Sequence, residues 1–162
     1  MLTKKNIQDI YQLSPMQEGI YFHATMDDRS QAYFSQMAYQ VSGSLEPSLI
    51  EESLNILVQR HDILRTVFNH KNADEIIQIV LKERKADFQF LDIRKLSAEA
   101  KTLYLDNFKE EDRQRNFNLN KDLLIRVAVI QLEDQQYELL WSIHHIIMDG
   151  WCQNILLDEF HQ

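Results

Sequence analysis

Hydrophobic residues in four stretches of the chain recur every three or four positions, the spacing of one face of an α-helix. The predicted helices cover residues 14–23, 47–58, 97–113 and 151–160. The first begins with a capping box, because the side chains of Ser14 and Gln17 can each accept a hydrogen bond from the other's backbone N–H. Apolar residues of the first and third helices are expected to face the core, namely Met16, Ile20, Tyr21, Leu103, Tyr104 and Phe108.

Six other stretches are rich in β-branched and aromatic residues or alternate between apolar and polar positions, as strands do. They cover residues 33–41, 63–68, 75–81, 88–91, 123–132 and 137–144. Stretches 63–68 and 75–81 are expected to pair around a polar turn at 69–72, and 137–144 to return antiparallel to the almost continuously apolar 123–132. Helices and strands are mixed without a regular βαβ repeat. The predicted fold is therefore a single α+β domain, with a mixed or antiparallel sheet packed against helices.

The composition excludes several classes of function. The net charge is −8 at pH 7 and no basic stripe appears, which disfavours binding to nucleic acid. The three glycines lie far apart, so there is no glycine-rich loop for a nucleotide phosphate. No apolar run resembles a signal peptide or reaches the ~20 residues of a membrane span. Cys152 is the only cysteine, which excludes an internal disulfide, and together these features predict a cytoplasmic protein.

Two adjacent histidines stand near the end of the chain, in the sequence SIHHIIMDG at residues 142–150. Because neighbouring residues of a strand point to opposite faces, His144 and His145 should diverge, and at most one of them enters a given cavity. The divergence argues against a metal site, which needs at least three convergent ligands. Cys152 has no neighbour in the sequence that would activate it as a nucleophile. From these residues alone, the turn is either catalytic or a buried structural turn.

Three segments resemble motifs of one family and occur in that family's order. Residues 144–150, HHIIMDG, resemble the HHxxxDG signature of the condensation domains of non-ribosomal peptide synthetases, which share the chloramphenicol acetyltransferase fold. Residues 13–23, LSPMQEGIYFH, resemble the family's opening motif. Residues 60–68, RHDILRTVF, resemble its second motif, with Asp62 where glutamate is common. A weaker likeness covers residues 112–119, so the resemblance extends over essentially the whole chain.

The resemblance implies an acyl transfer that forms a peptide bond in the biosynthesis of antibiotics and other secondary metabolites. The amine of an acceptor aminoacyl thioester attacks a donor peptidyl or aminoacyl thioester, and a phosphopantetheine arm tethers each to a carrier protein. The chain itself is expected to bind no cofactor directly and no metal, because the partner carrier proteins supply the arms.

The resemblance also implies roles for the residues of the turn. His145 would face the tunnel where the two arms meet, and would act as a general base or position the amine. His144 would be structural. Gly150 would leave room for the donor arm and could offer its N–H to the developing oxyanion.

Four further residues receive expected roles around the turn. Asp149 and Arg65 would pair as a buried salt bridge that ties the turn to the second motif. Met148 and Trp151 would line the substrate tunnel, although Trp151 is most simply explained as a packing residue.

The family's complete domain has two lobes, and this chain ends just after the signature. We therefore expect residues 13–162 to be the N-terminal lobe of a condensation domain whose second lobe is absent, so that the fragment alone is inactive. Residues 1–12 are expected to be a docking or linker segment that receives the upstream synthetase subunit. Its polar members are Lys4, Lys5, Gln8 and Asp9. The other expected partners are upstream and downstream peptidyl carrier domains.

Two alternatives to a condensation domain remain open at this point. An epimerisation domain of the same synthetases has the same histidine turn but inverts an α-carbon, and the motifs that distinguish it lie in the second lobe. The second alternative is a non-catalytic docking or interaction module. A cyclisation domain is excluded, because its family replaces the histidine pair with aspartates and His144 and His145 are intact.

Overall fold

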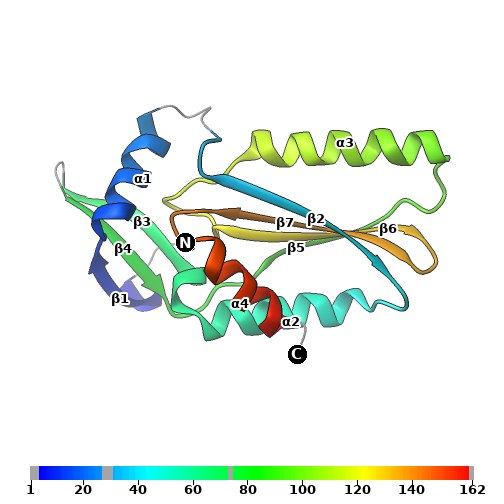
Figure 1. Cartoon of the computed structure of the whole chain (residues 1–162). Coiled ribbons are helices and arrows are strands. Elements are labelled where there is room, and N and C mark those ends of the chain that lie inside the picture. The colour runs from blue at the N-terminus through cyan, green and yellow to red at the C-terminus, as the bar shows by residue number, and fades with distance from the viewer. Residues whose placement is uncertain (1–3, 27–30, 73–74, 161–162) are drawn as a thin grey trace.

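The computed structural model describes residues 4–26, 31–72 and 75–160, which form two β-sheets and four α-helices (Figure 1). The strands are β1 (Ile7–Gln12), β2 (Phe34–Ser42), β3 (Thr66–Asn72), β4 (Glu75–Leu81), β5 (Asp87–Asp92), β6 (Ile125–Glu133) and β7 (Gln136–His144). The α-helices are α1 (Pro15–Met26), α2 (Pro47–Arg60), α3 (Ala98–Arg115) and α4 (Gly150–Phe160). Two short 3-10 helices are η1 (Lys4–Asn6) and η2 (Asp62–Arg65).

The four-stranded sheet positions the histidine turn at the end of β7. Its strand order is β2-β7-β6-β5, antiparallel except for the parallel pair β5 and β6. Helix α3 runs along one face of this sheet, whereas α2 and α4 lie on the other (Figure 1). Because both faces are covered, β6 and β7 are buried along almost their whole length, as their nearly continuous apolar sequences predict.

Consecutive residues of β7 point to opposite helices. The indole of Trp141 meets the ring of Phe160 in α4 edge-on, with the ring centroids 5.2 Å apart. The hydroxyl of Ser142, one residue further, donates a hydrogen bond of 2.6 Å to the carboxylate of Asp112 in α3. The alternation that the sequence predicts for this strand is therefore confirmed up to the first histidine.

The small sheet has the strand order β1-β4-β3, all antiparallel, and lies at the same end of the molecule as α1 (Figure 1). A separate apolar cluster lies within this sheet, made of Val67, Ile77, Ile79 and Leu81. Phe68 belongs to the main core instead, and its N–H donates to the carbonyl of Leu119 at 2.9 Å. The small sheet is thus joined to the rest of the protein through β3.

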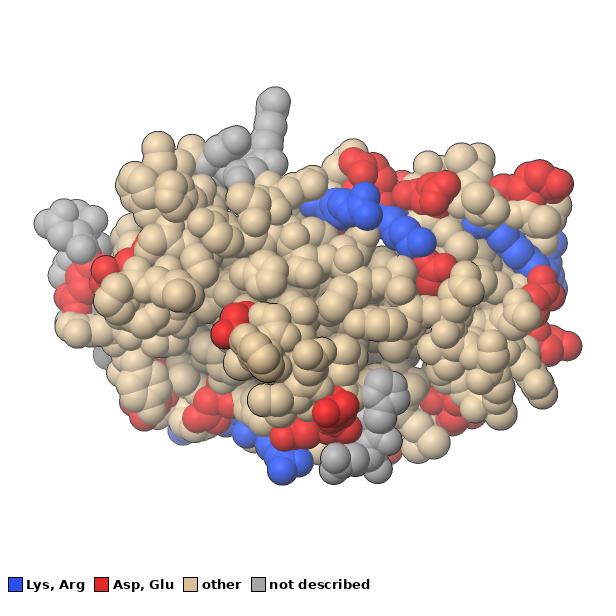
Figure 2. All heavy atoms as spheres, in the orientation of Figure 1, with Lys and Arg blue, Asp and Glu red and all other residues tan. Residues whose placement is uncertain are grey.

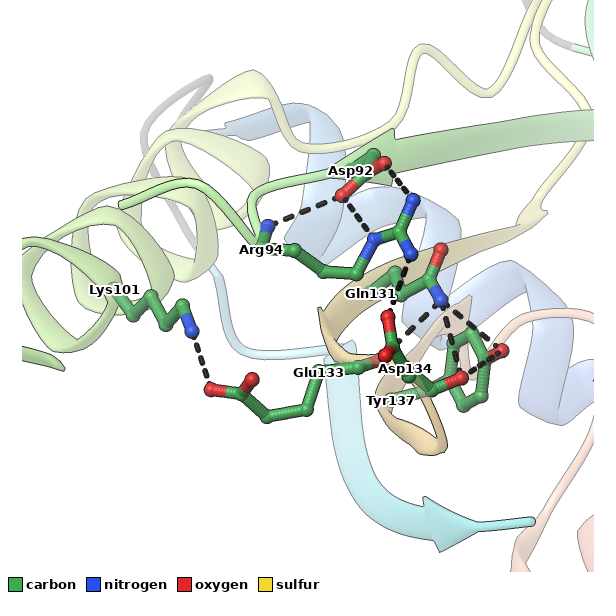
Figure 3. Close-up of polar contacts among 7 residues, drawn as sticks. All are labelled: Asp92, Arg94, Lys101, Gln131, Glu133, Asp134 and Tyr137. Atoms are coloured by element: carbon green, nitrogen blue, oxygen red, sulfur yellow. Dashed lines mark hydrogen bonds and ion pairs between the residues drawn. The ribbon is translucent and has the colours of Figure 1, made fainter. Parts of the chain in front are cut away.

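Polar contacts hold the β6–β7 turn, which lies at the opposite end of β7 from the histidines (Figure 3). Arg94 donates to Asp92 and to Asp134 of this turn, each at 2.8 Å. The hydrogen bonds that Asp92 accepts from the Arg94 side chain and backbone lower the pKa of Asp92 to about 2. Lys101 of α3 forms an ion pair with Glu133. The hairpin is therefore fixed at its far end, independently of the histidine turn.

The structure confirms the α+β class and the type of every predicted helix and strand. The predicted capping box forms, because the Gln17 N–H donates to the Ser14 hydroxyl at 3.2 Å and the Ser14 N–H donates to the Gln17 side chain at 3.0 Å. Ser97 caps α3 through the N–H of Ala100. Local sequence signals therefore locate the helix starts correctly.

Two expectations about strands are wrong. Residues 62–65 form η2, so the strand expected over 63–68 begins at Thr66. It then continues through the predicted turn to Asn72, because the exposed end of a hairpin accepts polar residues such as His70 without burying them. No strand is predicted before Leu13, yet residues 7–12 form β1.

Two residues expected in the core are exposed. Met16 lies in the first turn of α1 with 75% of its surface exposed, and Leu103 of α3 is exposed as well. Tyr104 and Phe108 of α3 are half-buried, and their rings stack on each other with their centroids 6.4 Å apart. Neighbouring helical residues are rotated by about 100° from each other, so Leu103 points away from this contact.

Candidate active site

The histidine turn joins the end of β7 to the start of α4, and backbone hydrogen bonds hold it in place. The His144 N–H donates to the carbonyl of Leu124 at 3.0 Å, and the His145 N–H donates to the carbonyl of Tyr33 at 2.8 Å. The Ile147 N–H returns to the His144 carbonyl at 3.2 Å. These bonds fix the main chain on both sides of the histidine pair.

His144 is buried and neutral. Its Nδ1 accepts a hydrogen bond of 3.2 Å from the N–H of Ile146, and its ring lies edge-on to Phe117, with the ring centroids 6.3 Å apart. Burial, with a smaller contribution from the charge of His145, lowers the pKa of His144 to about 4. A neutral imidazole that accepts at Nδ1 carries its proton on Nε2. Such a ring is suited to a structural role.

His145 is half-buried and has the opposite arrangement of its ring nitrogens. Its Nδ1 lies 3.3 Å from the carbonyl oxygen of Met148. A carbonyl oxygen can only accept, so Nδ1 must carry the proton in this contact. In the neutral form of the ring, Nε2 then retains its lone pair. The turn thus presents one imidazole nitrogen that can accept a proton or a hydrogen bond from a substrate.

Asp149 caps α4 and is exposed. Its Oδ1 accepts hydrogen bonds from the N–H groups of Trp151 and Cys152, at 3.1 and 3.0 Å. These bonds, that of Cys152 first, lower the pKa of Asp149. Gly150 is the first residue of α4, and a Cβ atom added there would meet open space. The expectation that Trp151 is a packing residue is wrong, because 83% of its surface is exposed.

The expected salt bridge between Arg65 and Asp149 is not formed. The buried guanidinium of Arg65 donates instead to the carbonyls of Val58 and Gln59 at the end of α2, to the Gln8 side chain at 2.9 Å, and to Asp62. The reason is local: η2 places Arg65 over the last turn of α2, where free carbonyls need donors. Asp149 instead provides an acceptor for the free N–H groups at the start of α4.

A different polar contact links the second motif to the last helix, and no separate signal in the sequence indicates it. The Nε2 atom of His61 lies 2.7 Å from the carboxylate of Glu159 in α4, and Arg60 lies 3.6 Å from the same carboxylate. The contact with His61 lowers the pKa of Glu159. The two residues are 98 positions apart, so only the packing of α4 against α2 brings them together.

An apolar cavity of about 250 Å³ opens between η2 and α4, next to the turn. Its lining residues are His61, Ile63, Leu64, Ile147, Met148, Cys152, Ile155 and Leu156. Met148 therefore connects two features, because it lines the cavity and its carbonyl faces His145. His145 is not among the lining residues, so the cavity lies beside the histidine rather than around it.

The face over α1 and the start of α4 carries few charges (Figure 2). Charged side chains gather instead along α3 and at the edge near α2. Several large apolar residues are exposed on α1 and α4, namely Met16, Phe22, Met26, Trp151 and Ile155. Within the described residues, no group of three or more potential metal ligands lies together, and no helix is long and apolar enough to span a membrane.

Residues 4–12 of the expected docking segment are part of the fold, and residues 1–3 of it lie outside the described residues. Gln8 bonds both Arg65 and Asp62, and Asp9 accepts from the hydroxyl of Tyr11 at 2.5 Å, which lowers the pKa of Asp9. Lys5 is exposed, and Lys4 lies in η1. A docking role for this segment remains a prediction.

Known proteins resemble this chain over nearly all of its length. The family model described as Condensation domain matches residues 7–162. A linear gramicidin synthase from Brevibacillus parabrevis is 45% identical over 161 residues, which are 99% of this chain and 3% of that protein. A plipastatin synthase from Bacillus subtilis (strain 168) is 45% identical over 160 residues, which are 98% of this chain and 4% of that protein. The chain thus spans only a small part of these relatives.

Solved structures share the fold. The starter condensation domain of rhizomide synthetase RzmA superposes with a TM-score of 0.83 at 22% identity, covering 94% of this chain and 38% of that one. A holo four-domain nonribosomal peptide synthetase bound to AMP and glycine gives a TM-score of 0.81 at 22% identity, over 95% of this chain and 11% of that one. The expected chloramphenicol acetyltransferase-like fold is therefore confirmed, and this chain belongs to the condensation-domain family of the non-ribosomal peptide synthetases.

Proposed function

We propose that this chain forms part of a site for peptide-bond formation between two carrier-bound thioesters, with His145 as the residue that receives the acceptor amine. The observation that carries the proposal is the contact between Nδ1 of His145 and the carbonyl of Met148 at 3.3 Å, within a turn whose sequence matches the family signature. This contact leaves Nε2 free to accept a hydrogen bond from an amine N–H.

The proposed reaction needs one proton acceptor and a fixed orientation. The amine nitrogen of the acceptor attacks the carbonyl carbon of the donor thioester, the carbon–sulfur bond breaks, and the proton lost by the amine passes to the sulfur of the leaving thiol. Nε2 of His145 can take this proton and return it, or it can hold the amine in the geometry of attack. Both roles use the same ring orientation.

The start of α4 offers a second element of such a site. Backbone N–H groups at a helix N-terminus have no acceptor within the helix and favour negative charge. Asp149 occupies those of Trp151 and Cys152, and Gly150 precedes them with no Cβ atom to block approach. We propose that the Gly150 N–H can donate to the developing oxyanion, and that Met148 and the exposed Trp151 line the path of the arms.

The partners follow from this chemistry as proposals. Upstream and downstream peptidyl carrier domains would deliver the phosphopantetheine arms, so the chain itself would bind no cofactor, and the reaction would take place in the cytoplasm. We propose that residues 13–162 act as an N-terminal lobe that needs a second lobe. Support comes from the small share of each solved relative that the chain covers and from the face with few charges over α1 and the start of α4.

The main experiment replaces His145 in a complete synthetase that contains this chain. His145→Ala should lower peptide-bond formation by roughly 100-fold or more, while both carriers stay loaded. His144→Asn is the matched control, because asparagine can accept the Ile146 N–H in place of Nδ1, and it should retain most of the activity. Retention of more than about a tenth of the activity by His145→Ala would exclude a base role for His145.

The product distinguishes the alternatives. Mass spectrometry and chiral analysis should find a new amide bond between donor and acceptor. Inversion of an α-carbon without condensation would identify an epimerisation domain, and unchanged carrier-bound thioesters would identify a non-catalytic module.

A second experiment tests the lobe itself. The 162-residue chain, mixed with loaded donor and acceptor carriers, should give no condensed product, because one lobe cannot align two tethered thioesters. Turnover by this chain alone would contradict the proposal.

A third experiment tests docking by exchanging residues 3–6 for those of an unrelated subunit. Exchange of residues 7–12 would also remove β1 and the Gln8–Arg65 contact. A loss of transfer could then result from a damaged fold rather than from lost docking. If this segment docks, transfer from the upstream subunit falls while transfer from a freely added donor carrier is unchanged. Unchanged transfer from both sources would remove the docking proposal.

A further inference from the structure

Gln17 lies where α1 approaches the histidine turn, and its capping role fixes the direction of its amide. The Oε1 atom accepts the Ser14 N–H at 3.0 Å, so the oxygen end of the amide faces the start of the helix. The NH₂ end must then face the opposite way. This orientation follows from the capping box alone, before any contact with the turn is considered.

The NH₂ end of Gln17 reaches two other elements. Its Nε2 lies 3.4 Å from the carbonyl oxygen of Ile146 in the turn and 3.4 Å from Oε1 of Gln78 in β4. The Ile146 carbonyl can only accept, so it requires the nitrogen end of the amide, in agreement with the capping box. Gln78 itself donates to the carbonyl of Gln12 at 2.9 Å. Gln17 therefore joins α1, the small sheet and the turn.

Ile146 is held at both ends of its backbone. Its N–H donates to Nδ1 of His144, and its carbonyl faces Gln17. The carbonyl of Met148, two residues further, is the group that faces Nδ1 of His145. A displacement of the Ile146 peptide would therefore move the acceptor that keeps the proton of His145 on Nδ1.

We propose that Gln17 is a positioning residue for His145: its amide holds the Ile146 carbonyl, and thereby holds the turn in which Met148 selects the Nδ1–H form of the imidazole. The effect of Gln17 on the ring does not depend on the reaction. Its effect on catalysis rests on the proposed function.

The decisive variant is Gln17→Glu, which separates the two tasks of the side chain. A glutamate at this position keeps the capping box, because its carboxylate still accepts the Ser14 N–H. It has no N–H to donate, and it turns an oxygen toward the oxygens of Ile146 and Gln78. In the 162-residue chain with nitrogen-15-labelled histidine, the Nδ1–H form of His145 should predominate in the wild type and fall to a minority in Gln17→Glu. The helix content should stay unchanged.

Two further variants keep the test informative if Gln17→Glu does not fold. Gln17→Met removes the acceptor of the Ser14 N–H and the donor to Ile146 and Gln78, without adding a charge. Ser14→Ala weakens the capping box but leaves the Gln17 amide donor in place. Gln17→Met should change the His145 tautomer as Gln17→Glu does, and Ser14→Ala should lower only the thermal stability. An unchanged His145 ring in the Gln17 variants, or an equal change in Ser14→Ala, would overturn the proposal.

Activity in a complete synthetase separates this inference from the proposed function. Gln17→Glu should lower kcat roughly 10- to 100-fold with little change in KM for either carrier, as expected when the geometry of attack is disturbed. A changed His145 ring with full activity would support positioning by Gln17 and contradict the role of His145. Lost activity with an unchanged ring would contradict the positioning role.

Discussion

Arg65 and Asp149 each satisfy the end of a helix, one from inside the protein and the other from its surface. Arg65 is buried and donates to the last carbonyls of α2, with Gln8 and Asp62 as further partners. Asp149 is exposed and accepts from the first N–H groups of α4. Each charge has the sign that its helix end favours, positive at the C-terminus and negative at the N-terminus.

The difference between the two regions lies in what replaces a lost contact. Water can reach the start of α4 and solvate its N–H groups if Asp149 is removed. Val58 and the guanidinium of Arg65 are buried, so water cannot replace the donor of the Val58 carbonyl without rearrangement. Removal of Arg65 should therefore lower the stability of the protein far more than removal of Asp149.

The largest expected effect is that of Arg65→Ala. The variant leaves the Val58 and Gln59 carbonyls and the Gln8 side chain without their donor, so the free energy of unfolding should fall by about 3–5 kcal/mol. Chemical denaturation of the 162-residue chain measures this loss. Arg60→Ala is the matched control, because 63% of the Arg60 side chain is exposed, and it should change the stability by less than about 0.5 kcal/mol. Equal losses of unfolding free energy in Arg65→Ala and Arg60→Ala would contradict the special role of the buried arginine.

The next effect concerns the buried imidazole of the turn. The pKa of His144 is about 4 in the folded protein, against the ordinary 6.5 in the unfolded chain. Between these values the unfolded chain binds more protons, so stability is complete above pH 6.5 and falls as the pH drops toward 4. The shift in the pKa of His144 corresponds to about 3 kcal/mol of unfolding free energy.

Comparison with His144→Asn isolates the contribution of this ring from those of the other histidines. The difference in unfolding free energy between wild type and variant should change with pH in this window and level off below it. Parallel pH profiles for the two proteins would show that His144 is not the buried neutral group of the turn.

The smallest effect is expected for Asp149→Ala. The variant removes an exposed cap, so the melting temperature should fall by much less than in Arg65→Ala, and Asp149→Ser should restore most of the loss because serine is also a good cap. The double variant Arg65→Ala/Asp149→Ala should show the sum of the two single losses, since the residues share no contact. A strongly non-additive double variant would indicate the salt bridge that this structure lacks.

The elements of the fold are easier to predict from the sequence than the contacts between them. Helix starts carry their signal locally, as in the capping box of Ser14 and Gln17, and the buried strands β6 and β7 carry theirs in continuous apolar runs. The strand β1 escapes prediction because an exposed edge strand needs no apolar face.

The site shows the same division. The motif locates the two histidines, and the alternation along β7 correctly places the first of them, His144, at which the strand ends. The partners of Arg65 and the pair His61–Glu159 could not be predicted, because they depend on how η2 folds over α2 and how α4 packs beside it. For Asp149 a signal is present in the sequence, since an aspartate just before a helix is a common cap.

We propose that the two adjacent histidines are held in opposite forms, His144 closed within the core and His145 presented to a substrate. Long-range proton–nitrogen NMR of the nitrogen-15-labelled histidine rings, recorded near neutral pH on the 162-residue chain, tests it directly. The structure predicts that His144 carries its proton on Nε2 and His145 carries its proton on Nδ1. A neutral His145 with its proton on Nε2 would have its lone pair on Nδ1, against the Met148 carbonyl rather than toward an amine, and would contradict this proposal.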